Sequence, residues 1–319
     1  MRTYIYAFLL IFFGHYSAHA AGPGTPTPGL NTPAATGLTT SIAAASVAGT
    51  RPTLTTPIPV KTDTKCYELR IYSCFPGRRD ALVQRFKNHT LRVFAKHKME
   101  SIGYWLPADS SQNTLYYILA YPSRVARDSA WNAFHADPEW IEIARKSEES
   151  GKIVEKVTSI FMNLSDISPA LKPSRAKATG SAATNPSGAA PNSTNPTNNA
   201  ATATHGAAPN RTFELRTYYC PPGKLPNLLA RFRDHTIKLF RQHGMESIAY
   251  WTTIDSAGTQ PHLVYMLAHP SKDAATANWA AFRSDPAWVS AKADSEKDGP
   301  IVEKTESIFL NPLPFSAIR

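Results

Sequence analysis

The chain has little cysteine, and this scarcity limits how it can be held together. Three cysteines occur in 319 residues, Cys66, Cys74 and Cys220, so a disulfide-stapled scaffold is excluded. Cys66 and Cys74 flank one short predicted strand, which holds them roughly 20 Å or more apart, beyond the reach of a disulfide. A bridge between Cys74 and Cys220 stays open as an alternative.

The sequence also lacks an apolar run long enough to cross a membrane. A shorter run, from Tyr4 to Phe13, follows Arg2, and a stretch with small residues ends at Ala20. This order is typical of a secretory signal peptide. We therefore expect residues 1–20 to be removed after Ala20 and the mature protein to be periplasmic or extracellular. An uncleaved anchor or a buried helix is the alternative.

Several signatures of catalysis and cofactor binding are missing. The sequence has no CxxC pair, no glycine-rich phosphate loop, no GxSxG and no dinucleotide-binding fingerprint. His89 and His97 are eight residues apart, which does not match the i, i+4 spacing of helical zinc ligands. The net charge is +10, but Lys and Arg form no concentrated, aromatic-studded run. Neither a metal nor a nucleic-acid partner is predicted.

Most of the chain consists of two copies of one domain. The stretches 21–65 and 166–211 are rich in Pro, Thr, Ala and Asn, and we expect disordered linkers there. The blocks 66–165 and 212–313 match each other, and a short tail, 314–319, follows. RFKNHTLRVFAKHKMESIGYW in the first block and RFRDHTIKLFRQHGMESIAYW in the second are identical at 12 of 21 positions without a gap. The chain is therefore a tandem duplication.

Each copy predicts the same order of elements. In the first copy, alternating β-formers and helically spaced apolar residues predict strands over 67–74, 101–106, 115–121 and 157–162 and helical regions over 79–97 and 124–151. The second helical region restarts at DPEW, with Asp137 as its N-cap and proline at the first helical position. The order β-α-β-β-α-β predicts an α+β fold with two ferredoxin-like domains.

The first strand of each copy has one apolar and one polar face. Leu69 and Ile71 point one way, and Glu68, Arg70 and Tyr72 point the other. We expect the apolar set to lie under the helices and the polar set to lie on the uncovered face. An open face rich in aromatics needs cover, so the two open faces are predicted to pair into an eight-stranded α/β barrel. The pairing joins the two domains of one chain or joins two chains in a homodimer.

A set of short motifs recurs in order across both blocks. It comprises YELRIY…PG, HT…F…KH, GYW, AYPS and AHPS, DPEW and IVEK. In this order and spacing the chain resembles the NIPSNAP family. The resemblance implies the dimeric α/β-barrel fold, which also serves cofactor-free monooxygenases, isomerases and haem-binding enzymes. For NIPSNAP proteins themselves, the resemblance implies no generally established catalytic activity.

Ten residues are candidate contacts to a ligand in the predicted barrel. They are Glu68, Arg70, Tyr72, Tyr104, Trp105, Glu214, Arg216, Tyr218, Tyr250 and Trp251. The Glu–Arg pairs either bind a polar ligand or form an ion-pair network across the barrel, because buried charge is costly unless it is paired. His89 and His235 are either general bases near a barrel mouth or structural hydrogen-bonding groups that hold helix on sheet.

These features favour a non-catalytic binding or interaction protein that holds a small apolar or aromatic ligand in the barrel. The alternative is a cofactor-independent monooxygenase or isomerase, with His89, His235, Arg70 and Arg216 as its catalytic candidates. Haem binding is a third option, which depends on fold analogy alone. The leading interpretation requires no cofactor.

Overall fold

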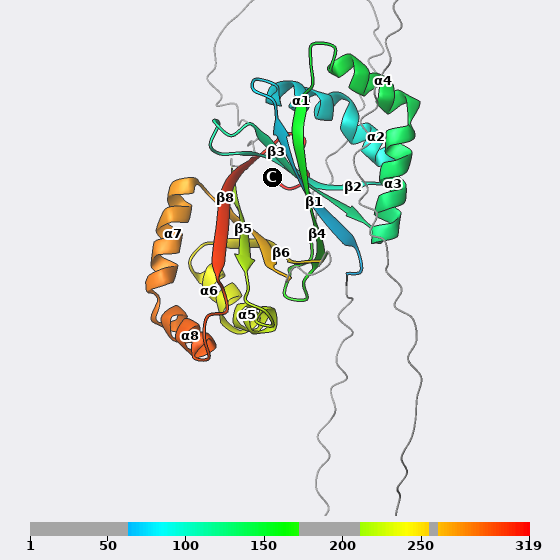
Figure 1. The fold of residues 1–319 in the computed structure, drawn as a ribbon. Helices are drawn as coiled ribbons and strands as arrows, with labels where there is room; N and C mark the ends of the chain where they lie inside the picture. The colour runs from blue at the N-terminus through cyan, green and yellow to red at the C-terminus, as the bar shows by residue number, and fades with distance from the viewer. Residues whose placement is uncertain (1–62, 172–210, 255–260) are drawn as a thin grey trace, which may run out of the picture. The chain divides into compact units, whose positions relative to one another are not determined.

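The computed structural model describes residues 63–171, 211–254 and 261–319. The predicted signal peptide and most of both linkers lie outside these ranges. The first copy comprises β1 (Cys66–Cys74), α1 (Arg79–Arg85), η1 (Phe86–Thr90), α2 (Leu91–Lys96), β2 (Glu100–Pro107), β3 (Thr114–Tyr121), α3 (Arg124–Ala136), α4 (Pro138–Ser147) and β4 (Val154–Leu164). The second comprises β5 (Thr212–Tyr219), α5 (Leu225–Arg231), η2 (Phe232–Thr236), α6 (Ile237–Gln242), β6 (Glu246–Thr253), β7 (Leu263–His269), α7 (Lys272–Ser284), α8 (Pro286–Glu296) and β8 (Lys304–Pro312). Both copies therefore have the predicted β-α-β-β-α-β order (Figure 1).

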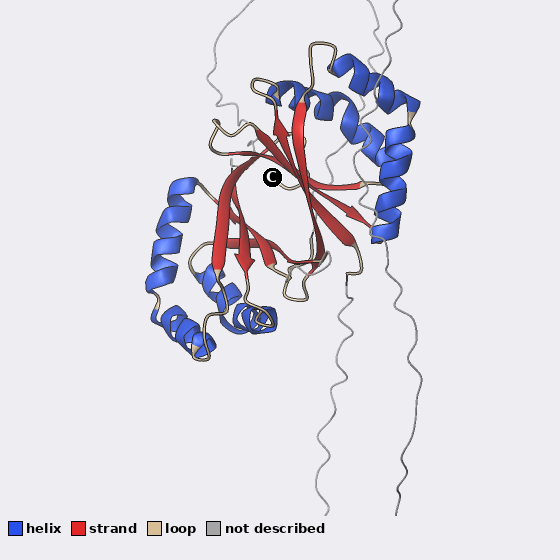
Figure 2. Cartoon of the chain, viewed as in Figure 1, coloured by secondary structure: helices blue, strands red, loops and turns tan. Residues whose placement is uncertain are grey.

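The eight strands form one closed antiparallel barrel, in the order β1-β3-β2-β8-β5-β7-β6-β4. The two domains thus pair within the chain, and the helices of each copy lie on opposite outer sides of the barrel (Figure 2). Two short seams join the copies. β2 pairs with β8 from Trp105 opposite Pro312 to Pro107 opposite Leu310, and β4 pairs with β6 from Met162 opposite Thr253 to Leu164 opposite Trp251.

The segments after the last strand of each copy extend these seams by crossing to the other copy. After β4, the amide of Ser165 donates to the carbonyl of Tyr250 at 2.9 Å, and the Tyr250 amide donates to Ser168 Oγ at 3.1 Å. After β8, Leu313 and Ser316 make the same two bonds to Tyr104, at 2.9 and 3.0 Å. The start of the predicted linker and the predicted tail are therefore ordered parts of the barrel.

The sequence predicts one continuous helical region over 79–97. In the structure, the first helix of each copy instead contains a π-helical segment. In the first copy this segment is η1, and the Thr90 hydroxyl donates to the carbonyl of Arg85 at 3.2 Å. In the second copy it is η2, where Thr236 makes the same bond to Arg231 at 3.1 Å. Single π-turns inside α-helices widen the backbone spacing locally. The threonine hydroxyl supplies a hydrogen bond that compensates for this widening.

The start of the second helical region follows the sequence prediction. Asp137 caps α4 by accepting a hydrogen bond from the Glu139 amide at 3.0 Å, and Pro138 occupies the first helical position. The same carboxylate also bonds His97 Nε2 at 2.8 Å, at the end of α2. One side chain therefore fixes the start of one helix against the end of another.

The three cysteines are separate buried thiols. Cys74 packs in the layer between the sheet and the helices of the first copy, and Cys220 packs in the corresponding layer of the second. The two layers belong to different copies, so the bridge that the sequence left open does not form. Burial raises the pKa of both thiols to about 11, which keeps them protonated and unreactive near neutral pH.

Candidate functional site

The barrel interior is an apolar core to which both copies contribute. Two of the predicted ligand contacts, Trp105 and Trp251, lie here and are fully buried. Trp105 packs against Phe213 and Trp251 packs against Tyr67, each with ring centroids 6.1 Å apart. Each pair joins residues from different copies. The two tryptophans therefore hold the two sheets together.

The close packing of the interior is clearest at Gly103. A Cβ atom built on this glycine would lie 2.2 Å from the Trp105 ring. The indole of Trp105 therefore occupies the space that a side chain at residue 103 would need. The second copy has Ala249 at the equivalent position, so its tryptophan cannot take the same placement relative to the strand.

The predicted faces of the first strand were wrong. Leu69 belongs to the barrel core and Ile71 packs against it, whereas Glu68, Arg70 and Tyr72 lie between the sheet and the helices. Among the other candidate contacts, Tyr104, Tyr218 and Tyr250 also lie on this helix-covered face, as do Glu214 and Arg216. The reason is that the helices supply polar partners for these groups, such as Trp131 and Trp279. The neighbouring residues on the same strands that face the barrel interior, such as Leu69 and Leu215, are apolar.

In the first copy, Glu68 is the centre of a buried hydrogen-bond network. Its carboxylate accepts bonds from Arg70 Nη1 at 2.6 Å, from Arg127 Nη2 and Nε at 2.6 and 2.9 Å, and from Trp131 Nε1 at 3.1 Å. Burial alone would raise the pKa of Glu68, but hydrogen bonds and charge attraction from Arg127 and Arg70 hold it below its usual range. The carboxylate is therefore ionised and shared by two guanidinium groups.

Arg70 has partners on every side of its guanidinium. It donates from Nε to Tyr117 Oη at 2.8 Å, from Nη1 to Ser159 Oγ at 3.0 Å and from Nη2 to Tyr72 Oη at 3.1 Å. The guanidinium also lies 4.1 Å from the Trp131 ring, a favourable cation–π arrangement. The network fits the structural alternative that the sequence left open for the Glu–Arg pairs, but on the opposite face of the sheet.

The second copy builds the same network from different residues. Glu214 accepts bonds from Arg216 Nη1 at 2.5 Å, Ser307 Oγ at 2.6 Å and Trp279 Nε1 at 2.6 Å. Ala275 replaces Arg127, and His269 replaces Tyr121, with its Nε2 at 3.2 Å from Glu214. One carboxylate here faces one guanidinium and one imidazole, so this network carries less fixed positive charge than the first.

We expect the stability contributed by Glu214 to be lost in acid. Burial raises the pKa of this carboxyl, but the bond with His269 and the charge of Arg216 outweigh burial and lower it to about 2. A carboxyl whose pKa is lower in the folded than in the unfolded chain stabilises the fold fully at pH values above its unfolded-state pKa. This contribution disappears as pH falls from about 5 to 2. Urea unfolding of wild type and Glu214→Gln across this range should show a stability difference that shrinks with falling pH. A difference that does not change with pH would contradict the assignment.

The histidines considered as general bases lie on the outside of the molecule. His89 is in η1 and His235 is in η2, and both side chains are exposed. The helices that carry them pack on the outer face of the sheet, away from the barrel core. The interpretation of these residues as general bases near the barrel mouth is therefore not supported by their positions.

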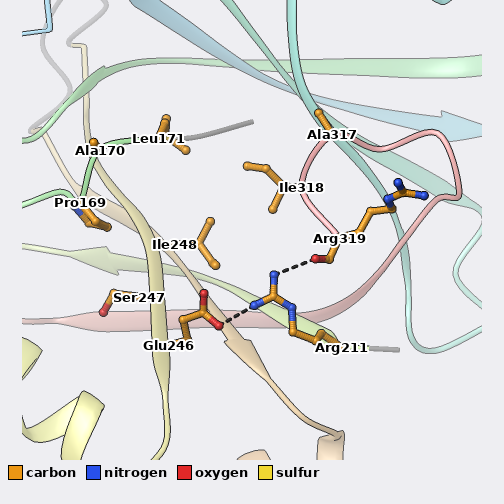
Figure 3. A pocket seen from close by; sticks show the side chains of 10 residues that line it. All are labelled: Pro169, Ala170, Leu171, Arg211, Glu246, Ser247, Ile248, Ala317, Ile318 and Arg319. Atoms are coloured by element: carbon orange, nitrogen blue, oxygen red, sulfur yellow. Dashed lines mark hydrogen bonds and ion pairs between the residues drawn. The ribbon is translucent and has the colours of Figure 1, made fainter. Parts of the chain in front are cut away.

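One candidate site is a pocket at one end of the barrel (Figure 3). Its volume is about 580 Å³, within the range of small-molecule sites. Three aliphatic side chains, Leu171, Ile248 and Ile318, line it and pack against the barrel core. They come from the segment after β4, from β6 and from the segment after β8. Both copies therefore contribute to the pocket.

The opposite wall of the pocket is polar. Arg211 donates to Glu246 Oε2 at 2.5 Å and to the main-chain oxygen of Arg319 at 2.7 Å, as the dashed lines in Figure 3 show. Ser247 follows Glu246 on β6, and its hydroxyl lies 2.5 Å from Tyr250 Oη. The pocket is thus amphipathic: its floor is aliphatic, and the opposite wall carries the charged pair Arg211–Glu246. Sequence reasoning missed it, because its lining segments are far apart in the chain and no motif marks them.

The pocket does not fit a haem or a metal. None of the ten described residues that line it is a His, Cys, Met or Tyr, so it offers no haem axial ligand. In the described ranges, no three His, Cys, Asp or Glu side chains are grouped to hold a metal ion.

No helix within the described part of the chain is both long and apolar enough to cross a membrane.

Comparison with known families agrees with the duplication. The NIPSNAP family model matches residues 67–169 and 213–317. The chain belongs to the NIPSNAP family. The matched regions include the crossing segments after β4 and β8, so the NIPSNAP domain is longer than the blocks expected from the sequence. Among curated proteins, none matches the chain significantly.

Solved structures similar to this NIPSNAP chain include NIPSNAP proteins and a monooxygenase-like protein. A NIPSNAP family protein of unknown function from Agrobacterium tumefaciens is 25% identical, and the match covers 36% of this chain and 100% of that one, with a TM-score of 0.31. A NIPSNAP-like domain protein from Burkholderia xenovorans is 22% identical, with 35% and 94% coverage and a TM-score of 0.32. A proposed monooxygenase from Lactobacillus acidophilus is 11% identical, with 78% and 94% coverage and a TM-score of 0.47.

Proposed function

We propose that this NIPSNAP chain is an exported, non-catalytic binding protein whose barrel-end pocket takes a small apolar or aromatic ligand. The observation that carries the proposal is where the candidate reactive groups lie. Arg70 and Arg216 are held under the helices by Glu68 and Glu214, and His89 and His235 are exposed on the outer helices. None of the four lines the pocket. Among the described lining residues, Glu246 is paired with Arg211 and the Ser247 hydroxyl with Tyr250, an arrangement better suited to holding a molecule than to converting it.

The pocket itself supports a ligand with an apolar body. Leu171, Ile248 and Ile318 form an aliphatic surface that is continuous with the barrel core. Arg211 and Glu246 are already paired with each other, so binding an apolar body on the aliphatic floor leaves their ion pair intact. Burial of apolar ligand surface then supplies the binding free energy.

Titration calorimetry with the neutral probe 1-decanol tests the pocket. Ala170 is an exposed lining residue, so Ala170→Trp should fill the pocket without disturbing the core and should abolish binding. Ala280→Trp, another exposed position, on α7, that does not line the pocket, is the matched control and should bind as wild type does. Absence of binding to wild type, or equal binding by Ala170→Trp, would contradict the proposal.

Export is supported by the charged start, the ten-residue apolar run and the small residues before Ala21. The protein should be recovered from the fraction of host cells outside the cytosol. Its mass should be that of a chain beginning at Ala21. A chain that retains Met1 in the cytosolic fraction would exclude export but would leave the binding proposal intact.

A further inference from the structure

We infer that the ligand of the barrel-end pocket carries an anionic group, which is bound by a basic groove on the second copy. This inference depends on the proposed binding function and assigns the chemical class of the ligand. The groove lies beside η2, α6 and the start of β6 and has a volume of about 570 Å³. Arg233, Lys238 and Arg241 provide its positive charge, and Ile237 and Met245 provide apolar surface.

The groove and the pocket are neighbours. Both are lined by Glu246 and Ser247, the first two residues of β6. A molecule whose apolar part contacts Ile248 and Ile318 in the pocket can therefore extend past the start of β6 to the basic residues. Glu246 does not repel an anion strongly at this junction, because Arg211 already pairs with its carboxylate at 2.5 Å.

A comparison of the two copies shows that the charge of the groove is specific to the second. On α2 of the first copy, Arg92 pairs with Glu139, and Lys96 Nζ lies 2.7 Å from Asp137 Oδ2 and 3.5 Å from Glu139 Oε2. Acidic residues from the start of α4 therefore neutralise the basic residues of α2. These ion pairs leave little net positive charge on that surface.

On the second copy one of the two neutralising acids is missing. Ala287 stands where the first copy has Glu139, and Lys238 stands where it has Arg92. Asp285 keeps the place of Asp137, and its carboxylate pairs with His243 Nε2 at 2.8 Å. Among the described residues, no carboxylate lies within ion-pair distance of Lys238 or Arg241, while Arg233 Nη2 lies 2.6 Å from Asp166 Oδ2. Two exposed cations in one groove thus lack a described acidic partner, and an anionic ligand can supply it.

The chemistry of the groove points to a monocarboxylate with an apolar body, such as a medium-chain fatty acid. Arginine binds a planar carboxylate with two parallel hydrogen bonds, and a nearby lysine adds a point charge. Because the cations are exposed, solvent and salt weaken each contact. We therefore expect a carboxylate to bind on the order of tenfold more tightly than the matching alcohol at low salt.

Calorimetry on the mature chain with decanoate and 1-decanol tests the inference. Replacing Lys238 and Arg241 by glutamine should weaken decanoate binding about tenfold and leave 1-decanol binding unchanged. The matched control replaces Arg92 and Lys96 on α2 by glutamine. It removes the same charge from the first copy and should change neither affinity. Arg92 is the counterpart of Lys238, and Lys96 follows Ala95, the counterpart of Arg241. Raising the salt concentration should reduce the advantage of decanoate.

Three outcomes would overturn the inference. If decanoate binds no more tightly than 1-decanol, the ligand class is wrong, although the proposed binding function stands. If the α2 and α6 variants weaken decanoate binding equally, net charge alone and not the groove explains the effect. If neither probe binds the wild-type chain, the proposed function and the inference both fail.

Discussion

Replacement of Glu68 by glutamine is expected to lower the free energy of unfolding by about 3–5 kcal/mol, because it leaves the buried Arg70 guanidinium without a counter-charge. Arg127 keeps its pair with Asp128. Glu68 is fully buried and accepts bonds from both Arg70 and Arg127. Glutamine keeps the shape of the side chain but loses the charge, and its amide hydrogens face two other donors. Urea denaturation at neutral pH measures the loss.

Two comparisons make the Glu68 result interpretable. Glu100 pairs with Lys65 on the surface, with side chains 42% and 41% exposed, so Glu100→Gln should cost less than about 1 kcal/mol. Glu214→Gln should cost less than Glu68→Gln, because Ala275 replaces the second arginine in that network. A Glu68→Gln chain as stable as the Glu100→Gln chain would show that the buried network adds little to folding.

Replacement of Trp105 by alanine is expected to lower the free energy of unfolding by about 3–5 kcal/mol, the usual cost of removing a large buried aromatic side chain. Trp105 is fully buried at the seam between β2 and β8 and packs against Phe213 of the other copy. Among the described residues, no group hydrogen-bonds its indole Nε1. The loss therefore measures packing across the seam and not a broken hydrogen bond.

The shape of the unfolding curve adds a second readout for Trp105→Ala. Because one barrel core joins the copies, both should still unfold together in a single transition, shifted to lower urea. Val125→Ala is the control, since Val125 is 76% exposed and its loss should change stability by about 0.5 kcal/mol or less. A Trp105→Ala chain that matches this control would mean that the seam tryptophan does not hold the copies together.

Much of the fold followed from the repeated sequence. Duplication, the order of elements, the Asp137 cap and closure into a barrel could be predicted, because each depends on local patterns or on the need to cover the sheet face that the helices leave open. Which face of the first strand the helices cover could not be predicted. Alternation shows that Glu68 and Arg70 share a face, but not which face the helices cover. The answer depends on Arg127 and Trp131, which α3 brings over Glu68 from about sixty residues away.

The candidate site was harder to predict than the fold. Its aliphatic floor combines Leu171, Ile248 and Ile318, which come from segments expected to be a linker, a strand and a tail. Residues in linkers and tails have no periodic pattern that marks them as part of a core. Only the crossing of these segments onto the other copy brings them together at one end of the barrel.

The crossing segments also bear on how the duplicated gene can change. Each crossing segment is fixed to the other copy by hydrogen bonds to the main chain of one tyrosine. The segment after β8 bonds Tyr104 through Ser316, and the segment after β4 bonds Tyr250 through Ser168. Such anchors tolerate exchange of the side chains between them: Phe315 in one segment corresponds to Ile167 in the other. Each copy therefore depends on the other copy to complete its fold, while its surface residues remain free to change. The basic groove that differs between the copies is what such divergence would produce.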